Sequence, residues 1–143
     1  MFSRTCEYAI RALIYIAQRS KDNAKCGIKE IAKGIDSPEY FIAKILQDLV
    51  KRRMLKSTKG PNGGFYLEED DFNTTLAAVV RQIDGDHLFT SCALGLRNCS
   101  NEHPCPLHEK YQWVRRDLKN MLESSTLGEV ADKLNSDLAF LKS

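Results

Sequence analysis

Soft metal ligands crowd one short, turn-rich stretch of this chain, SCALGLRNCSNEHPCPLH, at residues 91–108. The stretch holds three of the five cysteines and two of the three histidines, namely Cys92, Cys99, Cys105, His103 and His108. Six residues separate the first two of these cysteines, and five separate the last two. Thiolates and imidazoles bind zinc or iron–sulfur clusters, and pairs of thiols can form disulfides. Three kinds of site are therefore open: a disulfide staple, a zinc site or an iron–sulfur site.

The composition indicates a globular protein with reduced thiols. The 143 residues suit one domain with a modest appendage, and the hydrophobic (43%) and charged (28%) fractions are ordinary for a globular chain. No apolar run approaches the ~20 residues that span a bilayer, and the start MFSR lacks the pattern of a signal peptide. We therefore expect a cytoplasmic protein with no membrane partner, where thiols stay reduced. An odd number of cysteines also disfavours a pure disulfide framework.

Spacing alone does not separate zinc from iron–sulfur chemistry. Structural zinc sites usually use pairs of cysteines two to four residues apart. Spacings of six and five residues are loose for zinc, although a histidine could complete the set. Iron–sulfur clusters tolerate looser spacing because their ligands reach different irons. The chain has no Cys-x-x-Cys motif and no obvious pocket sequence, which disfavours a thiol oxidoreductase, so we expect no enzyme activity.

The elements that must position this stretch are mostly helical. Apolar periodicity predicts a largely buried helix over residues 4–19, a short helix over 28–34 and a second helix over 38–53. Extended runs at 54–57 and 65–67 flank KGPNGG, which is a strong turn signal and predicts a β-hairpin. A helix-turn-helix followed by a hairpin makes a winged helix. The predicted fold class is mainly α with a small β-hairpin wing.

Local signals refine the helix over 38–53. Asp36 or Ser37 is expected to be its N-cap, with Pro38 in the first helical turn. Its core face is expected to hold three apolar residues, with Leu46 as a further candidate; the three are Phe41, Ile45 and Leu49. A later helix over 73–85 is expected to be capped by Asn73 or Thr74 and closed by Gly85.

The exposed face of the helix over 38–53 and the wing tip are expected to contact double-stranded DNA. Residues 1–67 carry 13 Lys/Arg against 6 Asp/Glu, whereas residues 68–143 carry 8 against 13. A basic first half favours a polyanionic partner. Recognition helices enter the major groove, and a glycine-rich hairpin can approach the minor groove closely. The candidate DNA-binding residues are Ser37, Glu39, Tyr40, Ala43, Lys44, Gln47, Lys51 and Arg52 from the helix, and Lys59, Gly60 and Asn62 from the wing.

A second long helix follows the cysteine stretch. In LHEKYQWVRRDLKNMLES, apolar residues at 107, 111, 114, 118 and 121/122 alternate by four and three, which is typical of a heptad seam. One long helix with a seam and no partner in its own chain indicates a homodimer. The alternative is that this seam packs on its own domain. A closing helix is expected after Ser125 or Thr126.

The wing and the cysteine triplet together resemble one bacterial family. The segments GPNGGFYLEEDDFNTTLAAVVRQIDG and STLGEVAD, with the clustered cysteines between them, are similar to the IscR/NsrR type of regulator, the Rrf2 family. The resemblance covers essentially the whole chain, from EYAIRALIYIA onward. It implies a winged-helix homodimer that binds a palindromic operator. It also implies a cluster between the long dimerisation helix and the other subunit's DNA-binding domain, with Cys92, Cys99 and Cys105 as ligands.

Two positions depart from the family pattern. Lys59 stands where the family usually has an arginine before the glycine, and a lysine cannot make the bidentate contact of an arginine. The family's commoner spacing of the cysteines is five and five, so one extra residue separates Cys92 from Cys99. The first departure bears on how the wing reads its groove, and the second on how Cys92 reaches a cluster.

The resemblance leaves the fourth ligand open between two residues, His108 and Glu7, with water or another group as the remaining alternative. His108 matches the histidine of the IscR-like branch, where three cysteines and one histidine hold a 2Fe–2S cluster. Glu7 stands where other branches offer an acidic ligand from the partner's first helix, as in nitric-oxide sensors with a 4Fe–4S cluster. The plain alternative for Glu7 is an i,i+4 pair with Arg11. Cys6 and Cys26 are expected to be small apolar residues with weak thiol character.

Three regions and one function follow as predictions. Residues 1–85 form the winged-helix DNA-binding domain, 86–106 the cysteine-rich cluster-binding loop, and 107–143 the dimerisation helix and the C-terminal helix. The predicted function is a DNA-binding transcriptional regulator whose operator binding is controlled by an iron–sulfur cluster, either 2Fe–2S or 4Fe–4S, that senses cluster supply, redox state or nitric oxide. The alternative is a winged-helix regulator that senses through free thiols or zinc.

Overall fold

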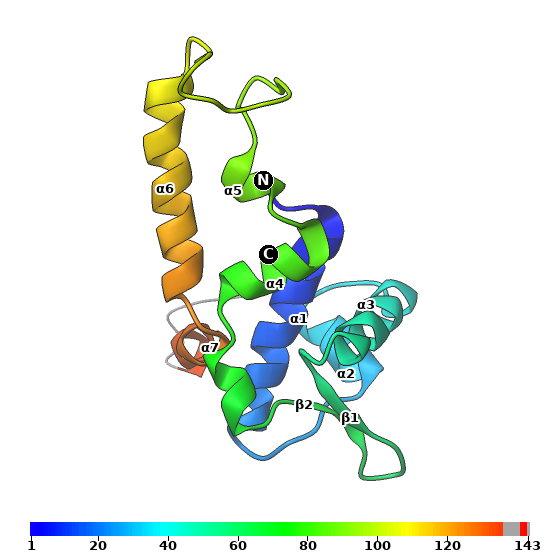
Figure 1. The fold of residues 1–143 in the computed structure, drawn as a ribbon. Coiled ribbons are helices and arrows are strands. Elements are labelled where there is room, and N and C mark those ends of the chain that lie inside the picture. The colour runs from blue at the N-terminus through cyan, green and yellow to red at the C-terminus, as the bar shows by residue number, and fades with distance from the viewer. Residues whose placement is uncertain (136–140, 143) are drawn as a thin grey trace.

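A computed structural model describes residues 1–135 and 141–142 of the chain (Figure 1). Residues 136–140 and 143 of the predicted C-terminal region lie outside the described residues. The helices are α1 (Arg4–Ser20), α2 (Ile28–Gly34), α3 (Glu39–Lys51), α4 (Leu76–Asp84), α5 (His87–Thr90), α6 (His108–Ser124) and α7 (Leu127–Asn135), with a 3₁₀ helix, η1 (Glu69–Asn73). The strands β1 (Lys56–Thr58) and β2 (Gly64–Tyr66) pair antiparallel. The fold is mainly helical with one hairpin, as predicted.

Helix α1 is the centre of the core. It packs against α2, α3, α4, α7 and β2, and its apolar circumference is buried as the sequence predicts. Ser3 caps its first turn, because the hydroxyl accepts a hydrogen bond from the Cys6 amide at 3.0 Å. Gly34 lets α2 approach closely, since a Cβ at this position would lie 2.4 Å from the Tyr15 ring. The helix-turn-helix is therefore fixed on a buried central helix.

The beginnings of α4 and α7 are tied together. The Leu76 amide donates to the Ser125 carbonyl at 2.9 Å, and the Leu127 amide donates to the Thr74 carbonyl at 3.0 Å. Thr75 is the N-cap of α4, so the predicted caps, Asn73 and Thr74, are wrong by one or two residues. Gly85 ends α4, as predicted. Because of this bridge, the chain after the cysteine stretch returns to α4 and to the core around α1.

Some local predictions are wrong. Pro38, rather than Asp36 or Ser37, is the N-cap of α3, and Ile42 is fully buried where Phe41 is only half-buried. The strands lie at 56–58 and 64–66 rather than 54–57 and 65–67, because Met54 and Leu55 belong to the core below the hairpin. The short α5 and the 3₁₀ helix η1 were not predicted, and His87 belongs to α5 rather than to a loop.

Helix α6 stands along one side of the molecule, and the cysteine stretch forms the loops at its N-terminal end (Figure 1). It packs on α4 and α5. Across the described residues, no helix is both long enough and apolar enough to cross a membrane.

Candidate functional site

Helix α3 presents the predicted recognition surface. Leu46 and Leu49 are fully buried and hold the helix on the core. On the other face, Glu39, Lys44, Gln47 and Lys51 are exposed, and Tyr40 is 80% exposed at the start of the helix. Ser37 and Ala43 are half-buried at the edge of this surface. Tyr40 and Lys44, four residues apart on this helix, therefore offer an exposed aromatic and an exposed cationic side chain.

One predicted phosphate contact, Arg52, is already engaged within the protein. Its Nε donates to an Asp48 carboxylate oxygen at 2.9 Å, and its Nη1 donates to the Gln82 main-chain carbonyl at 2.5 Å. These bonds join the end of α3 to the end of α4. In the sequence, Arg52 belongs to a basic run, which suggests a DNA contact. Its carbonyl partner is 30 residues away and could not be predicted from the sequence.

The wing tip is glycine-rich and exposed, as predicted. Lys59, Gly60 and Asn62 are exposed, and Gly60 has a positive φ of 103°, a conformation that favours glycine. The base of the wing pairs with the chain before α2. There the Cys26 amide donates to the Phe65 carbonyl at 2.9 Å, and the Phe65 amide donates back at 2.8 Å. The segment around Cys26 is thus hydrogen-bonded to β2 of the wing as a third segment. The sequence did not predict this pairing.

The cysteine loop brings its ligand candidates together as two pairs. The Sγ atoms of Cys92 and Cys105 lie 3.8 Å apart. The Sγ of Cys99 lies 3.3 Å from Nδ1 of His108. Among the described residues, no three His, Cys, Asp or Glu side chains are arranged so that they could hold one metal ion. The donor chemistry of the set, three thiols and one imidazole, suits an iron–sulfur cluster, and each donor already has another within 4 Å.

His108 is buried and held by amide side chains. It is 7% exposed, and its Nε2 lies 2.7 Å from Asn101 Oδ1 and 2.9 Å from Gln112 Nε2. Gln112 also donates to Asn101 Oδ1 at 3.0 Å. A proton on Nε2, donated to Asn101, leaves the lone pair of Nδ1 directed at Cys99, which is the form that binds metals. Sequence reasoning missed both amides, although Gln112 follows His108 by four residues on one helix.

The surroundings of Cys6 and Cys26 shift the thiol pKa in the opposite direction from those of Cys92. Burial, with the charge of Asp84 as the next cause, raises the pKa of Cys6 to about 12. Burial, with the charge of Glu30 next, raises the pKa of Cys26 to about 11. Hydrogen bonds from the backbone amides of Leu94 and Leu96, in contrast, lower the pKa of Cys92. Cys6 and Cys26 are therefore protonated core residues, whereas Cys92 has more thiolate character.

The other fourth-ligand candidate, Glu7, lies on a different element. It is exposed on α1, where it lines an open pocket of about 240 Å³ with Phe2, Ile10 and Arg11. Arg11 does not pair with it: Arg11 Nη2 donates to the Ile35 carbonyl at 3.0 Å, and the guanidinium lies 4.6 Å from the centre of the Tyr8 ring. The plain alternative for Glu7, a pair with Arg11, is therefore wrong. His103 is exposed in the loop.

The predicted seam of α6 is divided between two faces. Leu122 is buried, and Tyr111 and Leu118 are half-buried, on a helix that packs on α4 and α5. Three residues spaced by seven form an exposed line along the helix: Leu107 (45% exposed), Val114 (61%) and Met121 (50%). One half of the seam therefore packs on its own domain, and the other half is available to a partner.

Comparisons with known proteins agree with this architecture. The family model Rrf2, described as "Iron-dependent Transcriptional regulator", matches residues 2–133. An HTH-type transcriptional regulator from Aquifex aeolicus (strain VF5) is 30% identical over 132 residues, 91% of this chain and 90% of that one. The regulator NsrR of Oceanobacillus iheyensis is 25% identical over 136 residues, 94% and 92% of the two chains.

Two solved structures show the same fold. CymR, the global cysteine regulator of B. subtilis, superposes with a TM-score of 0.73 at 20% identity, over 92% of this chain and 96% of that one. IscR from T. potens superposes with a TM-score of 0.71 at 17% identity, over 97% and 91%. The relatives are regulators rather than enzymes. Their likeness runs through the winged helix, the cysteine loop and α6, and the chain belongs to the Rrf2 family of transcriptional regulators.

Proposed function

We propose that this protein regulates transcription in the cytoplasm by binding a palindromic operator as a homodimer, and that an iron–sulfur cluster on the cysteine loop controls that binding. The observation that carries the proposal is the arrangement of the loop. It places Cys92 against Cys105 and Cys99 against His108. The relatives named IscR and NsrR support a cluster as the occupant.

Cys92, Cys99, Cys105 and His108 would hold the cluster. When bound, the cluster supplies a redox- and ligand-sensitive group that crosslinks the loop. Asn101 orients the imidazole of His108 by accepting from its Nε2, and Gln112 holds Asn101 in place by donating to the same oxygen. In a dimer, Glu7 of the partner subunit is the alternative fourth ligand. His108 has the stronger support, because it already contacts Cys99.

A series of polar contacts connects the loop to the recognition helix. Arg115 on α6 donates to the carbonyls of Thr90 and Ser91, directly before Cys92, at 3.2 and 2.9 Å. At the other end of α6, Glu123 accepts from Arg81 of α4 at 3.1 Å. The residue after Arg81 is Gln82, whose carbonyl binds Arg52 at the end of α3.

These contacts give the loop a physical route to the DNA-binding surface. A change in the loop moves Arg115, α6 and α4, and α4 carries the end of α3 with it. Operator affinity and the state of the loop are then coupled reciprocally.

Anaerobic reconstitution tests the proposal. The protein, supplied with iron and sulfide, is expected to turn brown and to bind iron and sulfide in stoichiometric amounts. Cys99→Ala is expected to lose both, whereas the core variant Cys26→Ala is expected to keep them. DNA binding is measured with the duplex that the protein itself enriches from random-sequence DNA. Equal affinities of the reconstituted and Cys99→Ala proteins would overturn cluster control, and a colourless protein with stoichiometric zinc would overturn the cluster.

A specific distance favours a second candidate, sensing by free thiols. With their Sγ atoms 3.8 Å apart, Cys92 and Cys105 need only a small movement to reach the S–S bond length of ~2.0 Å. A hydroperoxide would oxidise this pair: the two thiols lose two protons and two electrons to form the disulfide, and the peroxide is reduced to an alcohol and water. The structural similarity to CymR shows the shared fold and does not decide between the two sensors.

Oxidation of the apo-protein distinguishes the second candidate from the first. If thiols are the sensor, a hydroperoxide changes DNA affinity in the wild type and not in Cys105→Ser, without iron. Cys99→Ser keeps the response, because Cys99 is not a member of the pair. If DNA affinity responds only after reconstitution with iron and sulfide, thiol sensing is excluded.

A further inference from the structure

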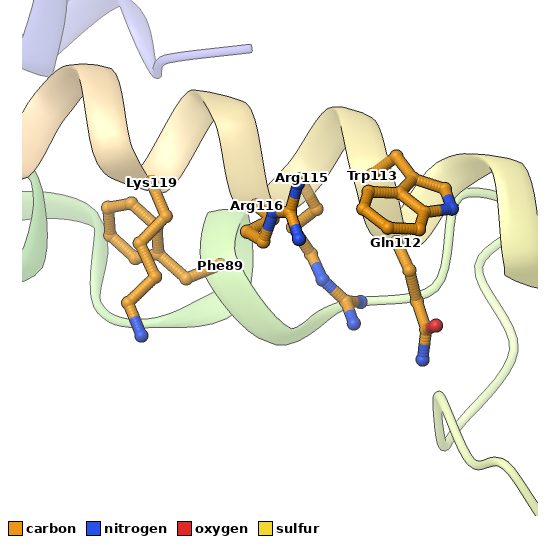
Figure 2. Close-up of a pocket in the computed structure, with 6 residues that line it drawn as sticks. All are labelled: Phe89, Gln112, Trp113, Arg115, Arg116 and Lys119. Carbon is orange, nitrogen blue, oxygen red and sulfur yellow. The ribbon is translucent and has the colours of Figure 1, made fainter.

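A cationic pocket lies between α5 and α6, next to the cysteine loop, and none of its lining residues belongs to α3. Its volume is about 340 Å³, within the size range of small-molecule sites. Its lining is Phe89, Gln112, Trp113, Arg115, Arg116 and Lys119. Figure 2 shows Lys119 extending beside Phe89 at one end of the pocket, Trp113 and Gln112 at the other, and the two arginines between them.

The pocket has three cations and no acid. Across residues 1–135 and 141–142, none of Arg115, Arg116 and Lys119 forms an ion pair with a carboxylate. Other basic residues near α6 are neutralised: Arg81 pairs with both Asp86 and Glu123. Three like charges that line one pocket without a counter-charge repel one another, so an anion bound among them is stabilised.

Aromatic rings form the apolar walls of the pocket. Phe89 is 8% exposed and is fixed by the Arg81 guanidinium, 4.6 Å from the centre of its ring. Trp113 is 55% exposed, and the Arg116 guanidinium lies 4.2 Å from its ring. A planar cation stacked on an indole leaves N–H donors free at its edge and makes a flat surface. The walls therefore suit a flat apolar body, and the cations suit an acidic group attached to it.

Helix geometry separates this pocket from the exposed line of Leu107, Val114 and Met121. At ~100° per residue, Gln112, Arg116 and Lys119 lie about 140–200° around the axis from Val114, whereas Trp113 and Arg115 lie about 100° from it. A partner subunit seated on the exposed line would therefore contact the side of α6 away from Gln112, Arg116 and Lys119. These three residues stay accessible to a small molecule in such a dimer.

Two residues of the pocket also hold the cysteine loop. Gln112 donates to Asn101 at 3.0 Å and contacts His108, the partner of Cys99. Arg115 donates to the carbonyls of Thr90 and Ser91, directly before Cys92. A ligand that attracts Arg115 or the Gln112 amide competes with these bonds, so occupancy of the pocket alters both ends of the loop.

We propose that the pocket between α5 and α6 binds a small organic anion with a flat apolar body, and that this ligand acts as a second input to the cysteine loop. The binding does not depend on the proposed sensing function, whereas the effect on regulation rests on it. Binding and loop response are therefore measured separately, without DNA.

Trp113 is the only tryptophan of the chain, so its fluorescence reports on the pocket. The probes are phenyl phosphate, inorganic phosphate and neutral benzamide, added to the full-length protein. We expect phenyl phosphate to give a saturable fluorescence change. Inorganic phosphate is expected to bind at least tenfold more weakly, and benzamide is expected not to bind. Lys119→Gln is expected to weaken phenyl phosphate about tenfold, which corresponds to about 1.4 kcal/mol. Lys110→Gln, which removes an exposed lysine from the same helix outside the pocket, is expected to change nothing.

Several outcomes would overturn the proposal. The anion site would be excluded if the fluorescence showed no saturable change, or if Lys119→Gln and the wild type bound phenyl phosphate with equal affinity. Equal affinities for inorganic phosphate and phenyl phosphate would exclude a preference for a flat apolar body. A change of oligomeric state in Lys119→Gln, measured by light scattering, would assign the surface to a second copy of the chain. The loop response is read as the iodoacetamide alkylation rate of Cys92 and Cys99. A rate that saturating phenyl phosphate leaves unchanged would overturn the second-input role while leaving the sensing proposal standing.

Discussion

Some of the side chains predicted to contact DNA are available for that contact, whereas another already forms hydrogen bonds within the protein. Lys44 and Lys51 are exposed on α3, and within the described part of the chain neither forms an ion pair. Arg52 instead joins α3 to α4 through Asp48 and the Gln82 carbonyl. The two lysines are therefore available to phosphates, and Arg52 has a structural role first.

Alanine substitutions at Lys44 and Arg52 are expected to give opposite signatures. Lys44→Ala removes one phosphate contact from each subunit of the proposed dimer, so it weakens binding to all duplexes and lowers the salt slope of log K by about 2. It leaves the free energy of unfolding within about 0.5 kcal/mol of the wild type. Arg52→Ala loses a charge-assisted bond to a carbonyl and is expected to lower that free energy by about 1 kcal/mol. Urea unfolding and DNA titration over a salt series measure both quantities.

The control is Lys29→Ala, an exposed lysine outside the predicted contact surface, which is expected to match the wild type in both measurements. A lowered salt slope with unchanged stability in Arg52→Ala would show that Arg52 contacts a phosphate after all.

The site could be predicted from sequence only where spacing along one element decides it. Cys105 and His108 are three residues apart at the start of α6, so His108 was readable as a candidate, and its contact with Cys99 agrees with that. The roles of Asn101 and Arg115 could not be predicted from the sequence, because their partners depend on how an irregular loop turns back on a helix. No periodic signal encodes such contacts, since they depend on the backbone path of the loop.

At the level of elements, the long periodic helices were predictable and the irregular connections were not. The helix over 4–19 and the helix-turn-helix match α1, α2 and α3 closely, because burial follows the helical period. The hairpin was displaced because Met54 and Leu55 read as an extended run but serve the core. Helix α5 has only four residues, too few for a periodic pattern. The bridge from Cys26 to Phe65 joins distant segments, and no local signal predicts it.

That bridge makes Gly64 a sensitive position of the wing. Gly64 has a φ of +146°, and an added Cβ would lie 2.8 Å from the Cys26 carbonyl oxygen. Gly64→Ala is therefore expected to push the wing away from Cys26 and to lower the free energy of unfolding by about 1–3 kcal/mol. DNA affinity is expected to fall as well, because the wing loses its fixed direction. Urea unfolding and DNA titration measure the two effects.

Gly27→Ser is the matched control, because an added Cβ there meets nothing within 4 Å and serine is a favourable N-cap for α2. It is expected to be at least as stable as the wild type. If Gly64→Ala unfolds like this control, the wing does not depend on its contact with Cys26.

Over the whole molecule, charge and apolar surface are distributed unevenly. The basic excess lies in residues 1–67, which contain α3 and the wing, so the part of the chain proposed to bind DNA has a net positive charge. Helix α6 stands at the side of the molecule and keeps an apolar line exposed (Figure 1). Exposed apolar residues arranged in one line on a helix are typical of an interaction surface. The single chain is therefore expected to be incomplete without a second copy on α6.

Val114→Glu tests this assembly. Val114 is the middle residue of the exposed line and is 61% exposed, so the monomer tolerates a charge there. In a dimer, the same carboxylate would be buried against an apolar partner, which costs several kcal/mol when the charge is unpaired. We expect the wild type to be a dimer in light scattering, and Val114→Glu to be monomeric or to dissociate at much higher concentration.

Asn120→Glu adds the same charge to an exposed position off the line and is expected to leave the dimer intact. A Val114→Glu protein that stays dimeric, with unchanged circular dichroism, would show that the dimer forms through another surface. A wild type that is monomeric at all concentrations would exclude the homodimer and, with it, Glu7 of a partner subunit as a cluster ligand.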